Sequence, residues 1–236
     1  LDKVEKQVHT LHEQLQKVNL EDLRMVAQKP PVLDDELIRK QMQQLKQMEE
    51  ELSHEVRALQ ANIQVADRGS IVKTYGEGPV QVVLELDFGD KAVSGGTRLA
   101  VLLWYDTPHA AWTLLQQVEE GAWNGATFTM EKARSIVAMP SSSSSDSNLQ
   151  FIEKSARGHD PWTVGLSDFG DDGIGLFVNL KDNNEYHQHD VCVGKIVDGF
   201  DALQQLVSQS RSRASKVTIK EAKASHLTRV QSSSLL

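Results

Sequence analysis

Two imidazoles and a carboxylate stand close together near the C-terminal end of the sequence, at His187, His189 and Asp190. Such side chains are typical ligands of zinc and copper. In an extended loop the two histidines would point the same way, but no cysteine or histidine run with zinc-finger spacing accompanies them. We therefore interpret the segment as a solvated loop, and we expect neither a metal nor another cofactor.

A second imidazole and carboxylate are adjacent in sequence, at His159 and Asp160. They are two of the three residue types of a catalytic triad, but neighbouring residues rarely have triad geometry and no nucleophile stands beside them. Gly158 precedes the pair and Pro161 follows it. This pattern is typical of a turn, here leading into a strand.

The composition argues against two classes of partner. The chain has 236 residues and a net charge of −8, whereas nucleic acids and anionic membranes attract a basic face. Arg211 and Arg213 are too few to form one. The longest apolar run, from Leu99 to Tyr105, is far shorter than the roughly 20 residues that cross a bilayer. We expect no nucleic-acid partner and no membrane insertion by this segment.

Neither the cysteine content nor the start of the chain indicates a compartment. A single cysteine, Cys192, excludes an internal disulfide but suits reducing and oxidising surroundings equally. The sequence starts at Leu1 rather than at a methionine, which leaves open whether a leader or anchor precedes it.

The elements that would position these residues fall into two halves. All 15 glycines and all aromatic residues lie after Arg68. A segment rich in Gln, Glu, Leu and Lys without either favours long helices. We therefore predict a helical coiled-coil stalk or hairpin over residues 1–68 and a β-rich domain over residues 69–236.

Apolar residues in the first half recur at alternating spacings of three and four, the pattern of a heptad repeat. Pro30 and Pro31 separate two such stripes. We predict that the second helix begins at Asp34 or Asp35 and ends near Ala66. The stripes consist of Leu1, Val4, Val8, Leu11, Leu15 and Val18, and of Ile38, Met42, Leu45, Leu52, Val56, Leu59 and Ile63.

A stripe of this kind needs an apolar partner. A coiled coil with another helix of the chain, with another subunit or with a helical partner protein would bury it. The alternative is an amphipathic helix that lies on its own domain. We therefore expect association through residues 1–66, most simply as a homo-oligomer.

The second half has the pattern of a mainly β domain that contains two helices. Residues 80–88 alternate apolar and polar side chains, and residues 97–104 follow as the second strand of a hairpin. Thr107 and Pro108 predict the cap and first turn of a helix over 108–119. Further predicted elements are strands near 128 and 136–137, strands over 162–166, 176–180 and 191–197, a helix over 199–208 and a strand over 216–221. Many short strands with two helices predict a closed antiparallel barrel.

The order of these pieces resembles the cyclophilin family of peptidyl-prolyl isomerases. The resemblance spans about residues 72–227 and implies an eight-stranded closed barrel with two capping helices and a peptide groove on one outer face. It is carried by the helix start at Pro108, Glu119-Glu120-Gly121, Trp123, Gly125, Thr127-Phe128, Phe177-Val178-Asn179-Leu180, the stretch from Val193 to Leu203, and Lys216-Val217-Thr218-Ile219.

The resemblance also implies that most active-site positions of the family are substituted. Met130 stands where the family has the arginine that hydrogen-bonds the prolyl nitrogen, and a thioether cannot donate a hydrogen bond. Ser135 and Ala138 replace an aromatic residue and a glutamine. Phe177 matches the groove floor and is retained. The groove-lining stretch aligns with Glu185 to Asp190, which brings in Tyr186 and puts Asp190 in the place of a histidine; the family's Ala-Asn pair falls on Gly165-Leu166.

These substitutions lead to one preferred function and two alternatives. We predict a non-catalytic or nearly inactive cyclophilin-like interaction module, without catalytic residues, that binds a protein or a proline-containing peptide. The first alternative is a weak or altered isomerase in which the pocket around Phe177 still orients proline. Arg134, four residues after Met130, is a candidate substitute donor, but an arginine beside a strand is typically a solvated surface residue. The second is a structural spacer or assembly protein in which the helical stalk is the functional part.

Overall fold

The computed structural model describes residues 35–89, 96–141, 149–169, 173–210 and 216–227. By its internal contacts the chain divides into two units, Leu1–Arg57 and Ala58–Leu236. The first predicted stripe, from Leu1 to Val18, lies outside the described residues. So do Arg211 and Arg213.

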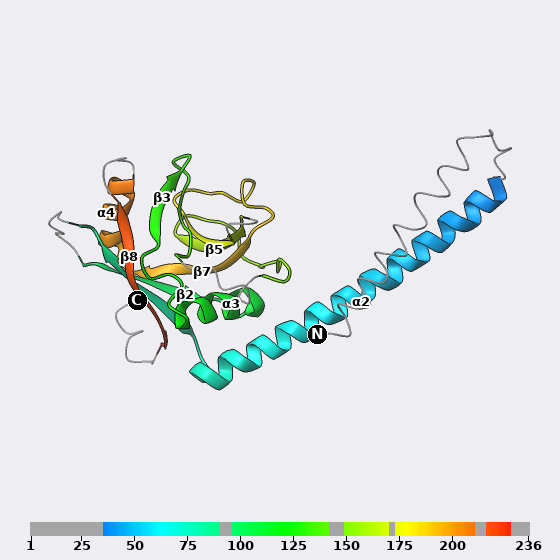
Figure 1. The fold of residues 1–236 in the computed structure, drawn as a ribbon, viewed down its shortest axis with the longest axis horizontal. Coiled ribbons are helices and arrows are strands. Elements are labelled where there is room, and N and C mark those ends of the chain that lie inside the picture. The colour runs from blue at the N-terminus through cyan, green and yellow to red at the C-terminus, as the bar shows by residue number, and fades with distance from the viewer. Residues whose placement is uncertain (1–34, 90–95, 142–148, 170–172, 211–215, 228–236) are drawn as a thin grey trace. The chain divides into compact units, whose positions relative to one another are not determined.

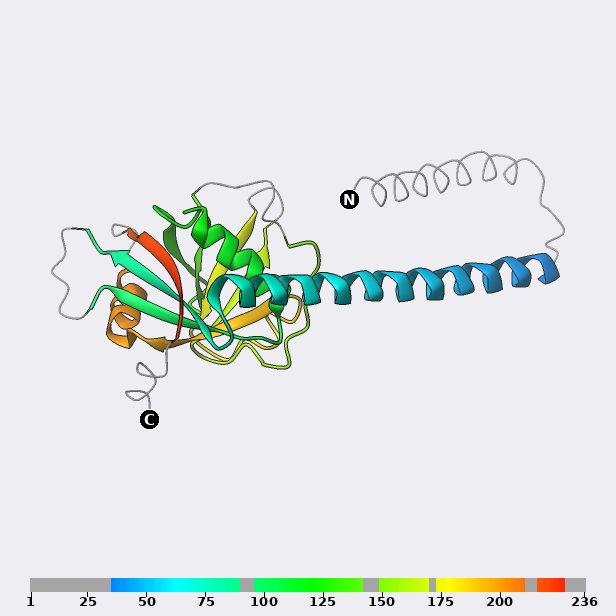
Figure 2. The same ribbon diagram turned by 90° about the horizontal axis from the view of Figure 1, so that it is seen from below.

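One long helix, α2, runs from Asp35 to Tyr75 (Figure 2). Its start agrees with the expected cap at Asp34 or Asp35, but it continues nine residues past the predicted end at Ala66. Gly69, which begins the predicted second domain, therefore lies inside the helix. Glycine lowers helix stability by about 1 kcal/mol relative to alanine, which is too little to end a helix that packing supports.

Most of the predicted stripe of α2 is exposed. Met42, Leu45, Leu52, Val56 and Leu59 have side chains that are between 43% and 64% exposed. Within the described residues no partner covers them, so the coiled coil and the oligomer remain predictions.

The β-rich part is a closed antiparallel barrel, as the resemblance implies. Its strands are β1 (Val80–Asp87), β2 (Arg98–Leu103), β3 (Thr127–Glu131), β4 (Ser135–Ala138), β5 (Thr163–Asp168), β6 (Ile174–Asn179), β7 (Val191–Asp198) and β8 (Val217–His226). They pair in the order β1-β2-β7-β5-β6-β4-β3-β8. Figure 1 shows the barrel with β2, β3, β5, β7 and β8 labelled. The predicted hairpin of β1 and β2 is confirmed by their antiparallel pairing.

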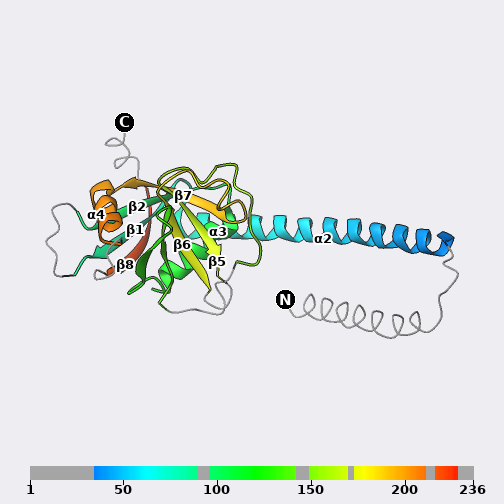
Figure 3. The same cartoon turned by 90° about the horizontal axis from the view of Figure 1, so that it is seen from above.

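Two helices accompany the barrel, α3 (Pro108–Glu119) and α4 (Phe200–Ser210). They lie near opposite ends of the barrel (Figure 3). Leu114 and Leu115 of α3 and Leu203 and Leu206 of α4 are buried in one hydrophobic core with the inward residues of the strands. The core therefore fills the barrel and extends to both helices.

Thr107 stands at the N-cap position of α3, as predicted, but its side chain does not cap the helix. Thr107 makes no side-chain cap hydrogen bond, and its buried hydroxyl has no partner. The buried carboxylate of Glu153 takes this role instead, accepting hydrogen bonds from the backbone N–H groups of His109 (3.1 Å) and Ala110 (2.7 Å). A negative charge at a helix N-terminus is favourable, so a residue 44 positions from His109 in sequence stabilises the start of this helix.

The last turns of α2 belong to the barrel unit. Ile71 is buried in the core, and the Gln64 amide donates to the carboxylate of Glu153 (3.0 Å). His109 Nδ1 lies 2.7 Å from the Asp67 carboxylate, and the ring stacks on Phe151 at 4.7 Å. Gln64 and Asp67, which precede the compositional border at residue 68, therefore contact the barrel unit.

Candidate functional site

The sheet face that carries Phe177 is defined by strand register. Phe177 of β6 pairs with Val137 of β4 on one side and with Gly165 of β5 on the other. Asn179 pairs with Ser135. Because paired residues share a face and neighbours along a strand alternate, these five residues lie on one face of the sheet.

Met130 and Ala138 belong to the opposite face. Ala138 is fully buried in the barrel core, and Met130 pairs with Ile136, which is also a core residue. The face of Phe177 instead receives Thr129 and Glu131, the neighbours of Met130. A shift of one residue exchanges the two faces of a strand, so the structure groups Ser135 with Phe177 but does not bring Met130 or Ala138 to them.

Phe177 has no exposed surface. On its own sheet the ring lies over Gly165, where a side-chain Cβ would overlap it. The missing side chain at position 165 therefore makes room for the ring. Leu166, the other residue in the aligned Ala-Asn position, is also buried.

The segment 184–189 covers the other side of Phe177. It forms turns rather than an extended loop, so the expectation that His187 and His189 point the same way is wrong: His187 is buried and His189 is exposed. The His187 imidazole stacks on the Phe177 ring, with 3.9 Å between ring centroids and 12° between planes. Asp190 accepts a hydrogen bond from Nδ1 of His187 at 2.7 Å, which fixes the orientation of the ring.

His159 is a second buried histidine at this site. Its ring lies 5.5 Å from both Phe177 and His187, and its Nε2 is 3.3 Å from the backbone oxygen of Asp190. Burial disfavours the charged imidazolium and lowers the pKa of His159 below the ordinary value. The predicted turn is present at 161–162, with Asp160 exposed, but no sequence signal indicated that His159 would be buried.

Buried amides connect the site to the surrounding turns. Asn183 donates to the side-chain oxygen of Asn179 (2.7 Å) and to the backbone oxygen of Arg134 (3.1 Å), and Asn179 donates to the hydroxyl of Thr163 (3.0 Å). Buried hydrogen-bonded networks of this kind fix a single arrangement. Sequence reasoning missed them because asparagines after a strand are equally typical of exposed turns.

Tyr186 fastens the covering segment to the β3–β4 turn. Its hydroxyl donates to Glu131 (2.9 Å) and accepts from the ammonium of Lys132 (3.0 Å). Lys132 and Ala133 have φ angles of 44° and 56°, in the left-handed region that non-glycine residues rarely adopt. Arg134 completes the turn with an exposed side chain.

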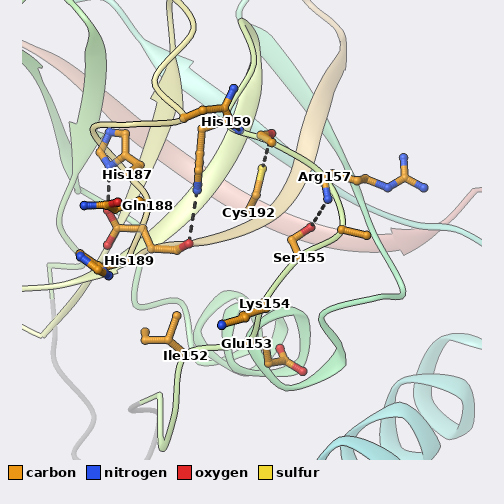
Figure 4. Close-up of a pocket in the computed structure, with 14 residues that line it drawn as sticks. Ile152, Glu153, Lys154, Ser155, Arg157, His159, His187, Gln188, His189 and Cys192 are labelled. Atoms are coloured by element: carbon orange, nitrogen blue, oxygen red, sulfur yellow. Dashed lines mark hydrogen bonds and ion pairs between the residues drawn. The ribbon is translucent and has the colours of Figure 1, made fainter.

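An open hollow of about 700 Å³ lies beside the covered ring, between residues 152–158 and 187–190 (Figure 4). Among its lining residues are His159, His187 and Cys192. The thiol of Cys192 donates to the backbone oxygen of Gly158 (3.4 Å), and burial raises its pKa to about 11. A protonated thiol is a poor nucleophile, so the hollow holds no activated cysteine.

Two classes of feature are not found in the described part of the chain. No cluster of three or more histidine, cysteine, aspartate or glutamate side chains has metal-binding geometry there. None of its helices has the length and apolar character required to span a membrane.

Comparison with known proteins identifies the fold. No protein-family model matches the chain, and no curated protein matches its sequence. A cyclophilin-type peptidyl-prolyl cis-trans isomerase of Cryptosporidium parvum is similar in structure, with a TM-score of 0.51 and 15% identity over 64% of this chain and 99% of that one. The same isomerase in the presence of the dipeptide Ala-Pro gives a TM-score of 0.50 and 15% identity over 63% and 99%.

These solved structures and the closed eight-stranded barrel together support a cyclophilin-like fold. At 15% identity they establish the fold and not the activity. The barrel of this chain is a divergent cyclophilin-like domain.

Proposed function

We propose that the cyclophilin-like domain is a non-catalytic protein-interaction module. The observation that carries the proposal is the burial of Phe177 under the His187 imidazole. The resemblance makes Phe177 the floor of a proline-binding groove. Since the ring has no exposed surface, a proline side chain cannot reach it unless His187 moves.

The charges around Phe177 also disfavour catalysis. Rotation about a peptide bond faces a barrier of about 18 to 20 kcal/mol, and one well-placed hydrogen-bond donor contributes about 2.7 to 4 kcal/mol of transition-state stabilisation in other enzymes. Met130 supplies no donor. The neighbouring residue on the Phe177 face is Glu131, whose carboxylate accepts hydrogen bonds and repels the electron-rich end of a twisted amide.

The weak-isomerase alternative requires a substitute donor and an open groove. Arg134 is exposed in the β3–β4 turn, and its backbone oxygen is held by Leu180 and Asn183. Even if its guanidinium reached the groove, proline would still meet His187 rather than Phe177. Because the Phe177 ring is covered, we infer that the domain binds its partner at another surface and does not catalyse isomerisation.

The second alternative, a spacer or assembly protein, concerns the helical stalk. We include the stalk in the proposal as the element through which the chain associates. The exposed stripe of α2 supports it, because a regular apolar stripe of this length is stabilised by another helix. Sedimentation of the full chain tests this part. A mass of two or more chains supports a homo-oligomer, and a monomer leaves a helical hairpin or a separate partner protein.

An isomerase assay with two matched variants tests the domain. The measurement is the cis-to-trans relaxation of an X-Pro peptide, together with the affinity for that peptide. We expect no acceleration by the natural chain. His187→Ala should uncover Phe177 and permit weak binding of the peptide, still without acceleration. His189→Ala removes an exposed histidine two residues away and should change neither quantity.

A further pair of variants locates the missing donor. Glu131→Arg combined with His187→Ala places a guanidinium on the Phe177 face and should give measurable acceleration. Met130→Arg combined with His187→Ala should not, because position 130 belongs to the core face. Turnover by the natural chain at the rate of active cyclophilins would contradict the proposal.

A further inference from the structure

Trp162 is displayed on the surface from a strained backbone position. Its side chain is 39% exposed, more than that of any other tryptophan in the chain, and its φ angle is 70°. This left-handed conformation costs free energy for every residue except glycine. A bulky residue in this strained conformation indicates that its side chain has a function for which the strain is retained.

Hydrogen bonds from two strands impose this conformation. The backbone N–H of Trp162 donates to the oxygen of Asn179 (2.7 Å), and the N–H of Ile196 donates to the oxygen of Trp162 (2.9 Å). The main chain at position 162 is therefore fixed between the ends of β6 and β7. Glycine would satisfy the same two bonds without strain, so the backbone geometry does not explain the indole.

A second exposed aromatic ring stands beside the indole. Phe200, the first residue of α4, is 44% exposed, and its ring meets Trp162 edge to face at 6.4 Å and 82°. The two residues come from distant parts of the sequence and together form one aromatic surface. We refer to this pair as the aromatic corner.

Acidic residues flank the aromatic corner in both segments. Asp160 precedes Trp162 by two residues, and Asp198 and Asp201 stand on either side of Phe200; all three are exposed. Within residues 160–162 and 195–201 the only cationic side chain is Lys195, so carboxylates outnumber ammonium groups three to one in these segments. Arg98, whose backbone lies against Gly199, pairs with Glu85 at 2.8 Å. The ligand that complements this surface carries positive charge.

We propose that the aromatic corner binds an arginine-bearing, basic segment of a partner protein. A guanidinium stacks on the indole face, and its N–H groups reach the flanking carboxylates. Lysine offers the charge but not the planar stacking surface. A second copy of this chain is a poorer occupant, because each copy carries a net charge of −8.

Short peptides titrated into the full chain test the proposal. The probes are acetylated, amidated hexapeptides in which glycine alternates with arginine, lysine or glutamate, and binding is followed by calorimetry and tryptophan fluorescence. We expect the arginine peptide to bind most tightly and the glutamate peptide not to bind. Raising the salt concentration from 50 to 500 mM should weaken binding several-fold, since surface charges are screened.

Three variants distinguish a defined site from general attraction to an acidic protein. Trp162→Gly and Phe200→Ala should each weaken binding of the arginine peptide by about tenfold, the upper range for a cation over an aromatic face. Phe169→Ala removes an aromatic residue of similar exposure, 40%, that lies outside the corner, and should leave the affinity within about twofold. Thermal unfolding of each variant verifies that it is folded.

Two results would overturn the proposal. One is an unchanged affinity in Phe200→Ala or in a folded Trp162→Gly chain. The other is an equal loss in Phe169→Ala, which would show that the peptide has no defined site. A sedimentation coefficient that rises with protein concentration and falls in Trp162→Gly would identify a second copy as the occupant instead.

Discussion

Phe177 lies on β6 and Trp162 directly precedes the neighbouring strand β5, but the two rings have opposite surroundings. Phe177 has no exposed surface and is covered by a histidine of the chain itself. Trp162 is held in a strained conformation and remains 39% exposed. Phe177, which the resemblance places in a binding groove, is thus part of the interior. Trp162 is exposed, although no sequence motif indicated a functional site there.

This difference shows that a fold can persist while the surroundings of a residue expected in its site change. The turn segment 184–189 buries the Phe177 side chain, because it places the His187 imidazole on the ring. No rearrangement of the barrel is needed. The topology therefore says little about which face of the domain is available to a partner.

Truncating the two aromatic residues should have very different effects on stability. Phe177→Ala is expected to lower the free energy of unfolding by about 4 kcal/mol, because it leaves a cavity beneath His187. Trp162→Gly should change it by less than about 1 kcal/mol, since relief of the positive φ offsets the loss of a partly exposed ring. Chemical denaturation of both variants measures the contrast, and equal losses would show that Trp162 is a core residue.

Two glycines test how tightly Phe177 is packed. Gly165→Ala should lower the free energy of unfolding by about 2 to 3 kcal/mol, because the added methyl group overlaps the Phe177 ring. Gly69→Ala serves as the control: nothing lies within 4 Å of its Cβ position, and alanine should stabilise α2 by about 1 kcal/mol. If Gly165→Ala leaves the free energy of unfolding unchanged, the Phe177 ring moves freely, and the proposal that the ring is tightly covered is contradicted.

The burial of His159 predicts a loss of stability in mild acid. The folded chain lowers the pKa of His159, chiefly by burial, so the unfolded chain binds the proton more readily. Stability should be complete above the ordinary value of 6.5 and should fall as the pH drops from there toward the folded pKa. Denaturation between pH 5 and 8 measures this slope.

Two histidine substitutions assign that slope. His159→Gln should flatten it, whereas His189→Ala, at an exposed position, should not. If the slope survives in His159→Gln, another group is responsible for it.

The smallest effect concerns Cys192, which lies in the hollow beside the covered site. With its pKa raised to about 11, the thiol should react with a disulfide reagent far more slowly than free cysteine at pH 7.5, and at the ordinary rate once the chain is unfolded. Because it is the only cysteine, the absorbance of the released thiol reports on it alone. If the thiol of the folded chain reacts rapidly, the reagent reaches Cys192 on β7 through the hollow, and the thiol is not protected by burial.

Local patterns predicted the secondary structure well. The alternation from Val80 to Phe88 predicted β1, and Pro108 with Gly121 bracketed α3 to the residue. The end of α2 was not predictable in this way, because Gly69 weakens a helix only slightly and packing of Ile71 in the core outweighs that cost. Thr107 stands at the predicted N-cap of α3, but the side-chain hydrogen bonds there come from Glu153, whose contact with the helix depends on the fold and not on local sequence.

The sequence alone determined the heptad stripe of α2, the order of strands and helices, and the resemblance to the cyclophilin fold, because these depend on spacing along the chain. Tertiary structure decided which face of β3 and β4 Met130 and Ala138 occupy, that His187 and His159 cover Phe177, and that Trp162 meets Phe200. These features depend on strand register and on contacts between segments far apart in sequence. Local spacing does not encode them. A register shift of one residue exchanges the buried and exposed faces of a strand, and the path of one loop determines which side chains it covers.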